Sequence, residues 1–194
     1  MTSVPSWWGY GAFFATFALF AVLRAPFMAR AVSTKVREKR EGPLEQAIQA
    51  LTALGVLGAP LVAATGLLRF ADQPLWAWRV PAGAAVMAVA AALFYRSHAD
   101  LGSNWSTTLT VRKEHTLVTS GVYARIRHPM YSSMVLLSLG QILAVPNWIG
   151  GLAGPLAVAL FLPARVGREE RLMLDTFGDA YRAYSARTGR LFPK

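Results

Sequence analysis

Residues 129–164 read PMYSSMVLLSLGQILAVPNWIGGLAGPLAVALFLPA, and these 36 residues include no charged side chain. A helix needs about 20 mostly apolar residues to cross a bilayer, so this run is too long for one crossing and long enough for two. The dipeptide Pro146-Asn147 lies near its middle and favours a turn. The run therefore predicts a tight helical hairpin, with helices at about 130–144 and 148–165.

Three further uncharged runs come earlier in the chain, at 7–23, 46–68 and 80–95. The first two have the length of a membrane span, and the third reaches it if residues 75–78 extend the helix and Arg79 snorkels to the membrane surface. Helices buried in a soluble bundle would keep a charged outer face, which these runs lack. The sequence therefore predicts an all-α integral membrane protein with five transmembrane helices.

The formal net charge of +10, from 20 Lys and Arg against 10 Asp and Glu, first suggests a nucleic-acid partner. However, 18 of these 20 basic residues fall in segments 24–40, 96–127 and 165–194, which five crossings place on one side of the membrane. Positive loops stay cytoplasmic, so we expect the N-terminus outside and the C-terminus inside. The charge is then a topology signal, no nucleic acid is expected, and the basic loop 35–40 is expected to meet anionic membrane lipids.

The composition excludes several classes of site. The chain has no Cys, so it can form no disulfide, thiol nucleophile or Cys-ligated metal centre. Its three histidines, His98, His115 and His128, are 17 and 13 residues apart, which fits no helical metal-binding pair, and no metal is expected. Serine-hydrolase and glycine-rich nucleotide-binding motifs do not occur in the sequence.

We expect one membrane-embedded domain over 1–194, with a three-span part at 1–98 and a part at 99–194 that carries the site. The polar connection 99–127 is long, as functional loops often are. Residues 167–186 carry an apolar and aromatic stripe at helical spacing, which predicts an interfacial helix that lies on the bilayer or closes a pocket. Gly178 is expected to break or bend it.

Two clusters of ionisable residues flank the predicted hairpin. One is the stretch 127–131 (RHPMY), and the other is Arg165 with Glu169 and Glu170. The two hairpin helices are antiparallel, so both clusters should meet at one membrane face, where converging ionisable groups suggest a functional site. Two plainer interpretations stay open: the first cluster anchors a helix at the headgroups, and Arg165 and Glu169 form an ordinary i,i+4 pair.

The C-terminal half resembles a known family over about residues 100–193. The motifs are 115–118 (HTLV), 121–123 (GVY) and 127–131 (RHPMY), followed by Glu169-Glu170, Phe177-Gly178, Tyr181 and Tyr184. In order and spacing they resemble the isoprenylcysteine carboxyl methyltransferase family. Its members are integral membrane enzymes related to phospholipid methyltransferases.

The resemblance implies an enzyme that uses S-adenosylmethionine to methylate the carboxylate of an isoprenylated cysteine. It implies a cytoplasmic cofactor pocket between the hairpin ends and the C-terminal segment, with Arg165 facing the substrate and Arg165 and Glu169 as catalytic residues. The implied cofactor-binding residues are His115, Thr116, Leu117, Val118, Tyr123, His128, Pro129, Met130, Tyr131 and Glu169. Two departures stand out: Ser133 where eukaryotic members often have Gly, and Thr108 where they have a Gln that touches the cofactor.

The chemistry of these residues suits a lipidic carboxylate that enters from the bilayer. A carboxylate such as Glu169 can pair with a cofactor cation, and tyrosine faces attract a sulfonium. A carboxylate acceptor is ionised at neutral pH and needs placement rather than a general base. Two alternatives remain: a phospholipid or amine N-methyltransferase of the same membrane family, and a non-catalytic multi-span protein whose clusters anchor helices.

Overall fold

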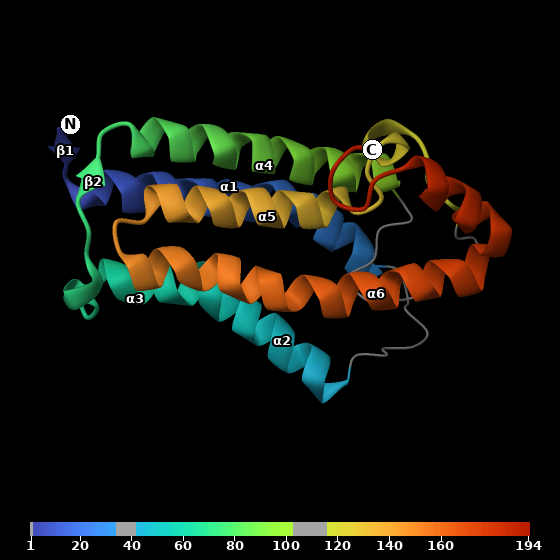
Figure 1. The fold of residues 1–194 in the computed structure, drawn as a ribbon, viewed down its shortest axis with the longest axis horizontal. Coiled ribbons are helices and arrows are strands. Elements are labelled where there is room, and N and C mark those ends of the chain that lie inside the picture. The colour runs from blue at the N-terminus through green and yellow to red at the C-terminus, as the bar shows by residue number, and fades with distance from the viewer. Residues whose placement is uncertain (1, 34–41, 103–115) are drawn as a thin grey trace.

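The computed structural model describes residues 2–33, 42–102 and 116–194, and these ranges are almost entirely helical. Two short strands, β1 (Ser3–Val4) and β2 (Leu75–Trp76), pair antiparallel, with Ser3 opposite Trp76. The helices are α1 (Ser6–Ser33), α2 (Pro43–Ala53), η1 (Leu54–Gly58), α3 (Ala59–Ala64), η2 (Arg69–Ala71), α4 (Arg79–Leu101), η4 (Gly121–Ala124), α5 (Pro129–Ala144) and α6 (Trp148–Arg187). Figure 1 shows α1, α4 and α5 running together, with α6 alongside α3 and α2.

Four segments are long and apolar enough to cross a membrane: Ser6–Ala29, Pro43–Ala64, Arg79–Leu101 and Trp148–Arg187. Large apolar side chains on these helices face outward, among them Val22, Leu54, Val89, Leu156 and Leu160. An exposed apolar surface of this extent suits lipid rather than water. The protein is therefore an integral membrane protein.

The helices expected at 130–144 and 148–165 are present as α5 and the first part of α6. Only residues 145–147 join them, and Asn147 caps α6 by accepting a hydrogen bond from the backbone of Gly150 at 2.9 Å. With 16 residues, α5 is about 24 Å long, below the roughly 30 Å of a bilayer's hydrocarbon core. Five crossings therefore stay a prediction.

The expected extension of the third span through residues 75–78 is wrong. Leu75 and Trp76 form β2, and the helix begins at Arg79. Nor does Arg79 snorkel: its side chain is buried and donates to the carbonyl oxygens of Ile142 and Leu143, at 2.6 and 3.1 Å. These carbonyls belong to the last turn of α5 and lack partners within their helix, so Arg79 satisfies them.

The expected boundary between a span ending at 165 and a separate helix at 167–186 is also wrong. One helix, α6, continues through residue 187, and its single interruption is the expected one at Gly178, where φ is +50°. A lone glycine such as Gly167 does not end a helix. Val166, which is buried with Tyr131 and Phe161, holds this part of α6 against α5.

Close packing ties the α2–η1–α3 segment to α5 and α6. A Cβ at Gly55 would lie 2.5 Å from the carbonyl oxygen of Ala153, so only glycine fits there. Gln141 of α5 is fully buried, and its amide donates to the carbonyls of Gly55 and Gly150, at 3.0 and 2.7 Å. Small residues and an interhelical amide are typical of packing between membrane helices.

Candidate active site

The start of α5 meets the charged half of α6. Pro129 begins α5, where its missing N–H costs no hydrogen bond, and His128 precedes it as the capping residue. The uncharged part of α6 ends at residue 164, and Arg165, Glu169 and Glu170 follow within the next two turns. The structure therefore brings the two predicted clusters together.

Glu170 is surrounded by basic side chains from two segments. Arg127 Nε lies 3.2 Å and His128 Nε2 lies 3.3 Å from Glu170 Oε1. Arg190 donates to both carboxylate oxygens, with its Nε 3.1 Å from Oε1. The backbone amides of Arg127 and His128 also donate to the carbonyls of Gly189 and Arg190, at 2.8 and 3.0 Å. This Glu170 cluster (Glu170, Arg127, His128 and Arg190) fastens the C-terminal segment to the start of α5.

Glu169, the adjacent carboxylate, has different partners. Tyr131 Oη donates to Glu169 Oε2 at 2.7 Å, and Arg165 Nε donates to Tyr131 Oη at 3.2 Å. His128 Nδ1 lies 3.8 Å from the same Glu169 oxygen. The Glu169 side chain is 30% exposed, against 13% for Glu170. This Arg165 chain (Arg165, Tyr131 and Glu169) thus ends on a carboxylate that can still accept hydrogen bonds from a ligand.

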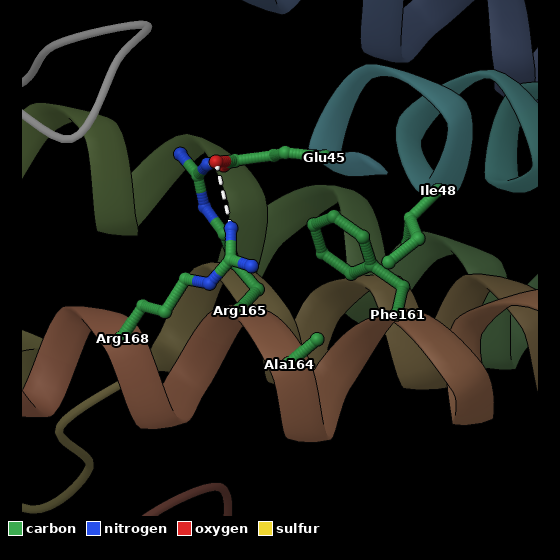
Figure 2. A pocket seen from close by; sticks show the side chains of 6 residues that line it. All are labelled: Glu45, Ile48, Phe161, Ala164, Arg165 and Arg168. Carbon is green, nitrogen blue, oxygen red and sulfur yellow. Dashed lines mark hydrogen bonds and ion pairs between the residues drawn. The ribbon is translucent and has the colours of Figure 1, made fainter. Parts of the chain in front are cut away.

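Arg165 also faces a pocket between α2 and α6. Figure 2 shows Glu45 of α2 reaching the guanidinium groups of Arg165 and Arg168, while Ile48 and Phe161 lie beside each other next to them. Glu45 is 5% exposed, pairs with Arg165, and lies 3.1 Å from Arg168 Nη1. The pocket has a charged end and an apolar end.

Three further tyrosines in this part of the molecule, Tyr123, Tyr181 and Tyr184, are buried. Tyr123 Oη donates to the carbonyl of Ser97 at 3.2 Å, and Tyr184 Oη donates to the carbonyl of Tyr123 at 2.7 Å. Burial, and the negative charge of Glu169 after it, raises the pKa of the Tyr123 phenol above its ordinary value, so this phenol remains a neutral donor. Tyr181 is 4% exposed, and its hydroxyl has no hydrogen-bond partner among the residues that the structure describes.

The predicted site residues divide into three groups. His128, Tyr131, Arg165 and Glu169 form one connected network, as described above. Pro129 is fully buried and Met130 packs on the core of α1, α4 and α5, and their predicted contact with the cofactor stays a prediction. Thr116 is exposed, Leu117 and Val118 are half-buried, and their predicted role in walling a cofactor stays a prediction. The expectations for His115 and Thr108 lie outside the described residues.

Sequence reasoning assigned no role in the site to Glu45 or Arg190, and it named Tyr181 only among the residues that carry the resemblance. Glu45 directly precedes the uncharged run 46–68, so it looked like the boundary of a span, although a carboxylate at that boundary was a usable signal. Arg190 gave no signal, since nothing local connects it to Glu170, 20 residues away. Within residues 2–33, 42–102 and 116–194, no group of His, Asp and Glu is placed to hold a metal ion.

Comparison with known proteins shows which family part of this chain is similar to. The model of the isoprenylcysteine carboxyl methyltransferase (ICMT) family matches residues 83–175, just under half of the chain, and confirms the resemblance. The protein-S-isoprenylcysteine O-methyltransferase of Homo sapiens is 39% identical over 97 residues, which are 48% of this chain and 34% of that protein. The Schizosaccharomyces pombe protein of the same name is 36% identical over 72 residues, 37% of this chain and 30% of its own length. The chain thus aligns with about a third of each of these curated relatives.

A solved structure shows the same fold. It is described as the eukaryotic intramembrane Ras methyltransferase ICMT, and the likeness has a TM-score of 0.67 at 23% identity over all of this chain and 69% of that one. The family match includes the whole Arg165 chain and ends before Arg190. Glu45 also lies outside the matched residues.

Proposed function

We propose that this protein is an S-adenosylmethionine-dependent methyltransferase that acts on the carboxylate of an isoprenylated cysteine or a similar lipidic carboxylate. One observation carries the proposal: the Arg165 chain joins α5 to α6 inside the family-matched region, next to a pocket with a charged and an apolar end. Arg165 and Glu169 are the proposed catalytic residues.

Arg165 is the proposed anchor of the acceptor. A free α-carboxyl group has a pKa of about 3.5, so the acceptor is already anionic at neutral pH and needs no general base. A guanidinium can hold one carboxylate oxygen and leave the other directed at the methyl group. Tyr131 supports this placement, because its hydroxyl accepts a hydrogen bond from Arg165 Nε.

The residues on the other side of Tyr131 fit S-adenosylmethionine. Glu169 is partly exposed and can accept from the cofactor's ammonium group, and the buried Tyr181 hydroxyl offers an unused polar atom close by. The ring of Tyr131 can face the sulfonium, an attraction worth about 0.5–2 kcal/mol. Thr116, Leu117, Val118 and Tyr123 are proposed to line the same site. When bound, the cofactor supplies the methyl group.

An amine acceptor suits these residues less well. The pocket holds two guanidinium groups, Arg165 and Arg168, and one carboxylate, Glu45, so its net charge is positive. A protonated amine would be repelled and would also need a proton acceptor before it could react. The pocket therefore favours an anionic acceptor over a phospholipid amine.

The lipid part of the acceptor is proposed to reach the pocket from the bilayer, against the apolar side chains of Ile48 and Phe161. Lateral entry costs little, because the lipid leaves surroundings as apolar as those it enters. With 18 of the 20 basic residues on one side of a five-span arrangement, we place the site at the cytoplasmic face and the N-terminus outside.

Two linked measurements on protein purified in detergent test the proposal. Wild-type protein should bind S-adenosylhomocysteine and transfer a labelled methyl group to N-acetyl-S-farnesylcysteine. Arg165→Ala should lose about 100-fold or more in transfer and keep its S-adenosylhomocysteine affinity. The matched control is Arg182→Ala, an exposed arginine of α6 that pairs only with exposed Asp179 among the described residues, and it should act like wild type. Absence of S-adenosylhomocysteine binding would reject the methyltransferase proposal, and equal activity of Arg165→Ala would remove Arg165 from the site.

A further inference from the structure

Glu45 places a buried carboxylate on the inward face of α2, and the packing of this helix does not require a carboxylate there. The inward-facing residues of α2 are Glu45, Ile48, Gln49 and Thr52, and most of the rest of the helix is exposed. A helix that only packs in a membrane protein would place small or apolar residues on such a face. Glu45 therefore needs an explanation beyond packing.

The partners of Glu45 supply that explanation. Glu45 pairs with Arg165, the proposed anchor of the acceptor carboxylate, and lies 3.1 Å from Arg168. Its carboxylate and the acceptor's carboxylate have the same chemistry and would seek the same guanidinium donors. Beside it, Ile48 and Phe161 offer the apolar contacts that a lipid chain next to that carboxylate would need (Figure 2).

The N-terminal end of α2, which carries Glu45, packs loosely against α6. Figure 1 shows α2 diverging from α6 toward its N-terminal end, while the η1 and α3 end stays beside α6. Pro43 and Leu44, which precede Glu45, are both exposed. The ion pairs of Glu45 with Arg165 and Arg168 are thus a main contact between this end of α2 and α6. Another anion can replace Glu45 in these pairs without movement of the packed η1–α3 end.

Resting on the proposed function, we propose that Glu45 is a specificity-determining residue whose carboxylate occupies the place of the acceptor carboxylate on Arg165 until an acid displaces it. A buried guanidinium without an anion is costly, so Glu45 keeps Arg165 paired in the absence of substrate. An acid can replace Glu45 because it brings an equivalent charge. An ester, the proposed product, carries no negative charge and cannot displace Glu45, so it binds with the Glu45–Arg165 pair in place.

Glu45→Gln tests the exchange by binding alone. The probes are N-acetyl-S-farnesylcysteine and its methyl ester, each titrated against wild-type and variant protein with S-adenosylhomocysteine present. Removing the internal competitor should tighten binding of the acid by about tenfold and leave the ester unchanged. Glu45→Asp, which keeps the charge on a shorter side chain, should give a smaller gain. Gln46→Ala, an exposed neighbour on α2, should give none.

Three results would overturn the inference: unchanged acid affinity in Glu45→Gln, weaker acid binding, or parallel weakening of acid and ester, as expected if Glu45 only holds the fold. A thermal unfolding scan confirms that each variant is folded before titration. Methyl transfer by the same proteins is measured in a separate assay. Tighter acid binding without any transfer would support the role of Glu45 and reject the proposed activity, whereas transfer with unchanged acid binding would do the reverse.

Discussion

Glu169 and Glu170 are adjacent in the sequence but belong to two regions with different chemistry. Glu170 is enclosed by the adjacent Arg127 and His128 and by the distant Arg190, and its side chain is 13% exposed. Glu169 is bonded to Tyr131 and is 30% exposed. A carboxylate that is fully paired, such as Glu170, holds segments together. A carboxylate that is partly exposed, such as Glu169, can still bind a ligand. The Glu170 cluster should therefore govern stability, and the Arg165 chain should govern binding and catalysis.

The largest effect on stability is expected from Glu170→Gln. Its loss removes the carboxylate that pairs with Arg127 in a largely buried place, leaves His128 with Glu169 at 3.8 Å, and breaks the side-chain attachment of Arg190. We expect the free energy of unfolding to fall by about 3 kcal/mol, toward the low end for a broken buried pair because Arg190 is exposed and can be hydrated. Denaturant titration in detergent measures it, and a loss below about 1 kcal/mol would contradict the assigned role.

A somewhat smaller loss of stability is expected from Arg79→Met, which removes the α4 guanidinium that binds the end of α5. The guanidinium donates to the carbonyls of Ile142 and Leu143 and to that of Pro74 at 3.4 Å, far from the Arg165 chain. Removing it leaves helix-end carbonyls unsatisfied, which costs about 2 kcal/mol. Methyl transfer per folded molecule should not change. A variant of normal stability and reduced transfer would show that this turn also serves the site.

Glu169→Gln tests the second region, the Arg165 chain. The amide keeps the shape and an acceptor for Tyr131 but loses the charge proposed to receive the cofactor's ammonium group. We expect S-adenosylhomocysteine to bind about tenfold more weakly, with the free energy of unfolding within about 1 kcal/mol of wild type. Titration calorimetry measures the first quantity. Unchanged affinity together with a large loss of stability would assign Glu169 to the same structural role as Glu170.

The smallest effect is expected from Gly178→Ala. At φ +50° this residue lies in a region that alanine adopts only with strain, so the kink in α6 should cost about 1 kcal/mol more. The kink precedes Tyr181 and Tyr184, so the variant also tests whether their placement matters for cofactor binding. An unchanged free energy of unfolding would mean that α6 can continue as a regular helix through residue 178 without loss of stability.

The sequence predicted the helices well where the hydrophobic run was long and bounded. The run 129–164 contains α5, the turn at 145–147 and the apolar part of α6, because Pro146 and Asn147 interrupt an otherwise uniform apolar segment. It failed at residues 75–78, where pairing with β1 outweighs hydropathy, and near 165, where a change in polarity does not end a helix.

For the site, the sequence predicted what lies close in the chain or at the two ends of one antiparallel pair. His128, Tyr131, Arg165 and Glu169 meet because α5 and α6 run side by side. Glu45 and Arg190 reach the same residues from distant segments, and no local pattern encodes those contacts. Such partners emerge only from the tertiary arrangement.

The most direct test of the central claim is the chemical form of the transferred methyl group. Wild-type protein is incubated with S-adenosylmethionine labelled in its methyl group and with N-acetyl-S-farnesylcysteine, and the product is treated with mild base. A methyl ester is hydrolysed by base, so the account predicts release of the label as methanol. Label that resists base, or transfer to a lipid amine in place of the acid, would contradict it.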